Sequence, residues 1–250
     1  MPLVSVLTPA RADRAALLVE AGESLAAQRL PAGWRLEWLV QEDGVEPSLG
    51  ELVRRFPFAR YQANGEQLGI AVTRNLALSR ADGRLVHVLD SDDILLPHGL
   101  STAIEAFERH PDIHWVAGQG DDLLPDGRRR PVPLDLPAGR VEAGELSQHF
   151  VDHGGVPIHP AGLTLRTAAV RALGGWAASP RSEDVTLLVA VAELAPGFVT
   201  PEATWLWRQH PGQTTKHPDW QTLFALADTQ IAQRIEALRR TGLRYLQGGS

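Results

Sequence analysis

Blocks of strand-like and helix-like pattern alternate along the first half of the chain. The stretches with strand character are short and cover residues 3–8, 36–40, 59–62 and 85–89. Between them, apolar positions recur at helical spacing over residues 11–29, 48–56 and 69–79. Because strands that alternate with helices pair as a parallel sheet with helices on its faces, this half predicts an α/β fold.

The second half of the chain is less regular. Helical periodicity covers residues 97–110, 167–173, 184–194 and 219–240, and extended chain is expected over 113–117, 162–166 and 198–208. Residues 138–160 are rich in Gly and His and favour neither state. No linker, internal repeat or low-complexity segment separates the halves, so we predict one domain over residues 1–250 that ends in a long helix at 218–250.

Composition removes several classes of protein. The chain has no cysteine, which excludes disulfides, thiolate metal sites and cysteine nucleophiles. Its formal net charge of −6 argues against a nucleic-acid-binding protein. Neither a signal peptide nor an apolar run of the roughly 18 residues that a membrane span needs is present. We therefore expect a cytoplasmic protein with no membrane span.

The tetrapeptide Asp90-Ser91-Asp92-Asp93 carries the strongest chemical signal. It follows the apolar run 85–89, which is typical of a buried strand, and open parallel sheets bind ligands at the carboxyl ends of such strands. Asp90 and Asp92 can point the same way, and a divalent cation between them would relieve their repulsion. Oxygen ligands favour Mg²⁺ or Mn²⁺ over zinc. The alternative, equally weighted for this tetrapeptide alone, is that Asp93 caps the next helix and the other two are solvated turn residues.

Further motifs give that tetrapeptide a context. They occur in the order Val4–Ala10, Glu42-Asp43-Gly44, Gly69–Asn75, Leu89–Asp93, Gly162–Arg166, Leu173–Trp176, Ser182-Glu183-Asp184 and Trp207–Gly212. This series resembles the family 2 glycosyltransferases of the GT-A fold, most closely over the first 110 residues. The resemblance implies a single GT-A type, Rossmann-like domain with a mainly parallel central sheet flanked by helices. It assigns nucleotide-sugar binding to residues 1–118 and acceptor binding and catalysis to 119–217.

The resemblance also implies a donor site. Thr8, Pro9, Ala10 and Asp43 would hold the base and ribose of a nucleotide diphosphate sugar, preferably a UDP-sugar, since a carboxylate accepts hydrogen bonds from both groups. Arg74 would contact the base or the diphosphate, and Asp90 the ribose. Taken singly, these residues also fit a strand ended by proline, an Asp-Gly turn and a surface arginine.

Catalytic and metal-binding residues follow from the same resemblance. Asp184 is expected to be the general base that takes the proton of the acceptor. Asp92 and His210 are expected to hold Mn²⁺ or Mg²⁺ beside the departing diphosphate. The competing interpretations are a hydrogen-bonded structural histidine and, at Glu183 and Asp184, acids that complement a helix N-terminus capped by Ser182.

Other residues are expected on the acceptor side. Trp176 and Glu183 are candidates for acceptor binding, although an aromatic in the position of Trp176 more often packs in a core. Arg128, Arg129 and Arg130 fit a solvated hairpin tip better than a site for a phosphorylated acceptor. The remaining histidines of interest, which match no zinc spacing, are interpreted as acceptor-loop or structural residues: His149, His153 and His159.

The function predicted from these residues is a metal-dependent, inverting transfer of sugar to a hydroxyl or amine. The acceptor would be a small molecule, an envelope precursor or a peptide, and no Gln-x-x-Arg-Trp segment indicates a processive enzyme. Two alternatives share the fold: a non-catalytic nucleotide-sugar-binding protein and a nucleotide-sugar hydrolase. One departure from the family pattern is Glu42, which replaces the first of two aspartates.

Overall fold

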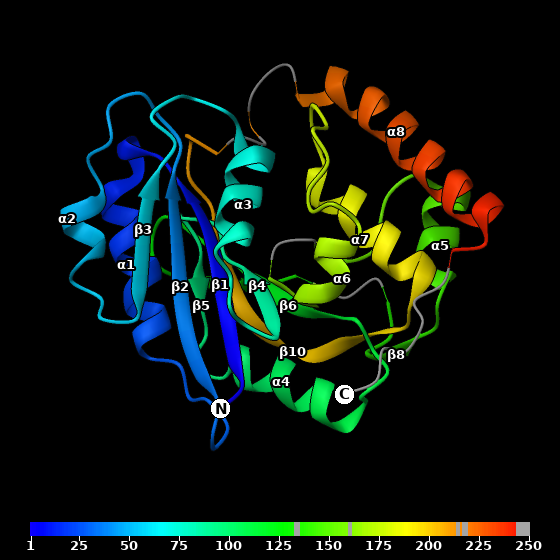
Figure 1. The fold of residues 1–250 in the computed structure, drawn as a ribbon, viewed down its shortest axis with the longest axis horizontal. Coiled ribbons are helices and arrows are strands. Elements are labelled where there is room, and N and C mark those ends of the chain that lie inside the picture. Colours follow the sequence, from blue (N-terminus) through cyan, green and yellow to red (C-terminus); the bar gives the residue numbers. More distant parts are fainter. Residues whose placement is uncertain (133–135, 160–161, 214–215, 217–219, 244–250) are drawn as a thin grey trace.

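The computed structural model describes residues 1–132, 136–159, 162–213, 216 and 220–243 (Figure 1). These residues form one ten-stranded sheet with helices on both of its faces. The strands are β1 Leu3–Ala10, β2 Arg35–Glu42, β3 Ala59–Ala63, β4 Leu85–Val88, β5 Ile94–Leu95, β6 Trp115–Leu123, β7 Arg129–Pro131, β8 Gly139–Val141, β9 Leu163–Arg166 and β10 Gly197–Arg208. The helices are α1 Ala15–Ala26, α2 Gly50–Val53, α3 Ile70–Ser79, α4 Gly99–Arg109, α5 Glu145–His153, α6 Thr167–Ala172, α7 Glu183–Leu194 and α8 Trp220–Thr241, with a 3₁₀ turn at Ala12–Arg14.

The strand order is β3-β2-β1-β4-β9-β6-β10-β5, and β7 and β8 pair off this path. Strands β1 to β4 are parallel to their neighbours among them, and β6 is parallel to β10. The predicted mainly parallel α/β sheet is confirmed. Strand β9 runs antiparallel to both β4 and β6. Beyond β4, the sheet therefore contains antiparallel as well as parallel strand pairs.

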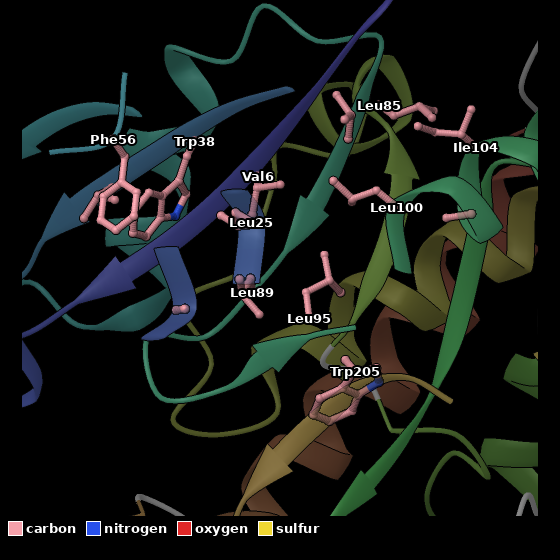
Figure 2. Close-up of a cluster of buried hydrophobic side chains, with 14 of the residues drawn as sticks. Val6, Leu25, Trp38, Phe56, Leu85, Leu89, Leu95, Leu100, Ile104 and Trp205 are labelled. Atoms are coloured by element: carbon pink, nitrogen blue, oxygen red, sulfur yellow. The ribbon is translucent and has the colours of Figure 1, made fainter. Parts of the chain in front are cut away.

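Alternation of side chains along the strands divides the core between the two faces of the sheet. Val4 and Val6 of β1 pack on the face covered by α1, α2 and α4, whereas Leu7 packs on the face covered by α3, α6 and α7. Figure 2 shows the first of these clusters, in which Trp38 of β2 meets Phe56 edge-to-face at a ring separation of 5.2 Å. Burial on both faces explains why β4 is almost continuously apolar.

Helix α8 packs against α5 and α7. Figure 1 shows it, orange to red, along the outer side of α7. Its Ile231 and Ile235 pack against Phe150 of α5 and Val189 of α7. No helix in the described ranges is long and apolar enough to cross a membrane.

Two segments differ from the sequence expectation. The ambiguous segment 138–160 contains β8 and α5, because α5 has an apolar face of Leu146 and Phe150 that the core buries. The strand expected over 113–117 continues to Leu123 and pairs with β7 as an antiparallel hairpin. This hairpin carries Arg128, Arg129 and Arg130.

The topology creates a crevice beside β1. Strand β2 pairs with one edge of β1 and β4 with the other, so the connections that leave β1 and β4 run to opposite sides. In open α/β sheets, ligands bind at such a reversal, outside the carboxyl ends of the strands. The segments after β1, β2 and β4 are those that hold the predicted donor residues.

Candidate active site

A cavity of about 340 Å³ lies at the carboxyl ends of β1, β2 and β4. Five residues that the sequence analysis assigned to donor or metal line it: Pro9, Ala10, Asp43, Asp90 and Asp92. The same cavity is lined by residues to which the sequence analysis gave no role, among them Arg14, Trp207 and Gln213. The structure therefore brings together side chains from both halves of the chain.

Asp43 organises one wall of the cavity. Its carboxylate accepts hydrogen bonds from the backbone amides of Leu68 (2.7 Å) and Gly69 (3.0 Å) and from the Asn64 side chain (2.9 Å). Gly69, whose φ is 85°, precedes α3 in a conformation that glycine adopts without strain. Asp43 thus fixes the loop that leads into α3, as well as facing the cavity.

Thr8 does not reach the cavity. Its side chain is buried, and its hydroxyl accepts a hydrogen bond from the indole nitrogen of Trp38 at 2.9 Å. The expectation that Thr8 contacts the nucleoside is therefore wrong in this structure, because the strand places its side chain inside the core. Pro9 and Ala10, the last residues of β1, line the cavity instead.

Arg74 is a buried cross-link. Only 1% of its surface is exposed, and its two terminal nitrogens donate to Asp90 (2.7 Å) and Glu183 (2.6 Å). The structure does not place Arg74 where it could contact the base or diphosphate, since its side chain is buried, pairs with both carboxylates and does not line the cavity. Instead it joins α3, the loop of residues 90–93 after β4 (the acidic loop) and the start of α7.

The electrostatics of the Glu183-Asp184 pair follow from this burial. Desolvation and the neighbouring Asp184 charge raise the pKa of Glu183 to about 7, against the opposing effect of Arg74. Desolvation likewise raises the pKa of Asp184, and the positive charge of Arg74 lowers it. Asp90 acts on both groups, which places the predicted base in the same charged cluster as the acidic loop.

Ser182 holds the entry to α7 in an uncommon conformation. Its φ is 53°, in the left-handed region, and its side chain makes no capping hydrogen bond. The proposed cap by Ser182 is therefore wrong. Its carbonyl instead accepts from the amide and the hydroxyl of Thr186. Strained backbone of this kind concentrates at functional sites, and here it precedes Glu183 and Asp184.

The predicted metal ligands Asp92 and His210 meet in the structure. His210 Nε2 lies 3.0 Å from Asp92 Oδ2. This contact lies within hydrogen-bonding distance. A carboxylate oxygen and an imidazole nitrogen are both donors to Mn²⁺ or Mg²⁺, so these two groups would be the ones to hold such an ion. Among the described residues, no three His, Asp or Glu side chains lie close enough together to hold a metal ion by themselves. Arg14 Nη1 also reaches the same Asp92 oxygen, at 2.6 Å.

Asp93 and Arg208 attach the acidic loop to β10. Burial raises the pKa of Asp93 well above its usual range, and the backbone amide of Arg208 donates to its carboxyl at 3.0 Å. The Arg208 guanidinium donates to the carbonyl of Asp92 at 2.9 Å. Asp93 does not cap the next helix, because His98 precedes α4. The loop is therefore tied to β10.

Trp176 packs in the core. It is 3% exposed and belongs to the apolar cluster on the α3 side of the sheet, which favours packing over a platform for sugars. The side chain of Asn75 holds it, donating to its carbonyl at 2.8 Å and accepting from its amide at 2.9 Å. A Cβ at the preceding Gly175 would lie 2.1 Å from Asn75 Oδ1, so this close approach needs glycine.

The other basic and histidine residues singled out from the sequence lie at or near the surface. Arg129 pairs with Asp121 and Arg130 with Asp122 on the exposed hairpin. The rings of His149 and His153 on α5 lie 4.5 Å apart at a tilt of 58°, beside a second cavity. His159 contacts the rings of Trp205 and Trp207 at 4.9 and 4.8 Å. Because Trp207 lines the main cavity, His159 supports one of its walls.

The model of a known family, Glycosyl transferase family 2, matches residues 5–154. The chain belongs to this family. The candidate residues Glu183, Asp184 and His210 lie beyond the matched segment, so the family match does not bear on them. A protein of Sinorhizobium fredii described as uncharacterized protein y4gI is 32% identical over 135 residues, which are 51% of this chain and 14% of that protein. This chain thus spans only a small part of that relative's length.

Solved structures of the S. aureus protein TarS share the fold. The TarS fragment 1–349 in complex with UDP-GlcNAc has a TM-score of 0.68 at 18% identity, over 99% of this chain and 75% of that one. Its complex with UDP gives 0.66 at 18% identity, over 96% and 72%. Another TarS structure gives 0.64 at 20% identity, over 95% and 42%. The predicted GT-A type architecture is thereby confirmed for this member of the family.

Proposed function

We propose that this protein is an inverting, metal-dependent glycosyltransferase that moves a sugar from a nucleotide diphosphate to an acceptor hydroxyl or amine. The observation that carries the proposal is the convergence of Asp43, Asp90 and Asp92 on one cavity, with the Glu183-Asp184 pair joined to Asp90 through Arg74. A donor site and a base thus share one charged cluster. UDP is the preferred nucleotide, since the TarS structures of the same fold were solved with UDP and UDP-GlcNAc.

The residues divide the reaction between them. Asp43, with Pro9 and Ala10 at the carboxyl end of β1, holds the nucleoside, and Asp90 orients the ribose. Asp92 and His210 would hold Mn²⁺ or Mg²⁺, which neutralises charge on a diphosphate leaving group. Asp184 takes the proton of the acceptor as its oxygen or nitrogen bonds to the anomeric carbon. The bond from that carbon to the diphosphate breaks on the opposite face, the nucleotide leaves with the electron pair, and the anomeric configuration inverts.

A screen of sugar nucleotides tests this proposal. Thermal shift with each nucleotide, with and without Mn²⁺, identifies the donor, and release of nucleoside diphosphate measures its consumption. A sugar transferred to an added acceptor supports the transferase. Release of sugar to water alone supports the hydrolase, and binding without release supports the non-catalytic binder. Tighter binding of GDP or TDP than of UDP would change the donor and leave the reaction class intact.

Replacement of Asp43 by alanine is expected to weaken UDP binding at least about tenfold, even in EDTA. The change removes a charged acceptor and also frees the loop at Leu68 and Gly69, and a hydrogen bond to a charged group contributes about 1.5–3 kcal/mol. Calorimetry on Glu66→Ala provides the matched control, since Glu66 is an exposed carboxylate in the same loop. Equal affinities in Asp43→Ala and wild type would remove Asp43 from the donor site.

Replacement of Asp92 by asparagine is expected to abolish the dependence on divalent ions and most UDP affinity. A neutral amide is a poor substitute for a charged oxygen ligand. Asp90→Asn should lose less metal binding, because Asp90 already pairs with Arg74. Mn²⁺ titrations of the two variants separate these roles. Equal losses would show that both carboxylates coordinate the ion, and an unchanged Asp92→Asn would place the ion elsewhere.

A further inference from the structure

Arg14 places a positive charge on the carboxylate that we assign to the metal. It ends the 3₁₀ turn between β1 and α1, and its side chain is 21% exposed. Nη1 donates to Asp92 Oδ2 at 2.6 Å, and Nη2 donates to the carbonyl of Gly212 at 3.0 Å. The guanidinium therefore bridges the acidic loop and the segment that follows His210.

The oxygen that Arg14 contacts is the one that faces His210. Asp92 Oδ2 lies 3.0 Å from His210 Nε2, so this one oxygen contacts both the guanidinium and the imidazole. An ion at about 2.1 Å from that oxygen would approach the guanidinium closely, and both are cations. Arg14 and the ion cannot share Asp92 Oδ2 without strong repulsion.

The rest of the acidic loop already has its positive partners. Arg74 pairs with Asp90, and Arg208 donates to the backbone carbonyl of Asp92. In this structure both carboxylates of the Asp90-Ser91-Asp92 motif are neutralised by arginines of the chain itself. A divalent ion gains little from entering such a cluster unless it displaces one of them. Arg14 is the more exposed, since the side chain of Arg74 is only 2% exposed.

We propose that Arg14 is a built-in competitor of the divalent ion at Asp92, which weakens metal binding until the donor arrives. The inference rests on the proposed function, in which Asp92 and His210 hold the ion. The diphosphate of a bound donor supplies negative charge both to the ion and to the displaced guanidinium. Metal and nucleotide therefore favour each other's binding by the same factor.

Titration of Mn²⁺ alone, without nucleotide, tests the competition. Arg14→Gln is expected to bind Mn²⁺ at least about tenfold more tightly than wild type, which corresponds to about 1.4 kcal/mol. Arg54→Gln is the matched control, because it removes the same charge from an exposed side chain that pairs with Glu51 and does not line the cavity. Its affinity should change less than about threefold. An Arg14→Gln protein that binds Mn²⁺ no better than wild type overturns the inference.

Repeating the titration with saturating UDP tests the coupling. The advantage of Arg14→Gln over wild type should shrink to less than about threefold, because the diphosphate releases Arg14 from Asp92 in the wild-type protein. An undiminished advantage contradicts the coupling. These results are separable from the proposed function: UDP binding in EDTA without Mn²⁺ binding in either protein rejects the competition and keeps the donor site. Tighter Mn²⁺ binding without UDP binding rejects the donor site and keeps the competition.

A measurement on the wild-type protein decides the matter even if Arg14→Gln does not fold. Mn²⁺ that displaces Arg14 should raise the rate at which phenylglyoxal modifies this side chain by at least about threefold. Mass spectrometry locates the modified residue, and Arg54, which is exposed and does not line the cavity, serves as the internal reference. A rate at Arg14 that Mn²⁺ leaves unchanged would refute the displacement.

Discussion

Replacement of Asp184 by asparagine is expected to lower sugar transfer by about 10² to 10⁴, the usual contribution of a positioned base. Donor affinity should stay close to that of wild type, because Asp184 lies outside the set of residues that line the donor cavity. The loss should therefore fall in kcat and not in the KM of the donor. Single-turnover assays together with UDP-sugar calorimetry separate the two quantities.

Two further observations test the same assignment. Because burial raises the pKa of Glu183 to about 7 and also raises the pKa of Asp184, wild-type transfer should increase with pH as the pair loses its protons. Asp184→Asn should lose this rise, whereas Asp82→Asn, an exposed change before β4, should keep both rate and profile. Full activity in Asp184→Asn would transfer the role to Glu183. A product that retains the donor's configuration would require another mechanism.

Replacement of Arg74 by methionine is expected to cost about 3–5 kcal/mol of folding stability, because it leaves Asp90 and Glu183 without their buried positive partner. For a chain of this size, that loss lowers Tm by roughly 10 °C. Activity should fall as well, since Arg74 positions the acidic loop against the start of α7. Thermal unfolding and transfer assays measure the two effects.

The control for Arg74 is an arginine of the same kind in a different setting. Arg54 pairs with Glu51 on the surface, where its side chain is 68% exposed, and such pairs contribute little to stability. Arg54→Met should therefore change Tm by only a degree or two. If Arg74→Met is as stable as Arg54→Met, the buried network does not hold the two halves of the site together.

Local sequence signals predicted the elements well, and for a physical reason. Periodicity of apolar residues reflects which face each segment buries, and this is written into each segment separately. No such signal predicted the direction of β9 relative to the neighbouring strands. Its antiparallel place between β4 and β6 depends on how the chain returns after α5, and nothing within Leu163–Arg166 encodes it.

The roles of the arginines were the part that the sequence could not supply. Arg74 was expected at a ligand or on the surface, because arginine is almost never fully buried unless it is paired. Its partner Glu183 lies 109 residues away, and Arg14 lies 78 residues from Asp92. No local pattern announces such pairs. The acidic loop itself was found, because its three aspartates follow a buried strand directly.

The attachment of the acidic loop to β10 bears on how this protein is made. Leu95 pairs with Trp205, and Arg208 reaches Asp93 across 115 residues of chain. During synthesis, β1 to β4 leave the ribosome long before these partners exist. A nascent or truncated chain that ends before β10 therefore has the first four strands but no anchored acidic loop. The chain should therefore gain the ability to bind the donor only once β10 has been synthesised and has paired with the sheet. Nucleotide binding then tests whether β10 has docked.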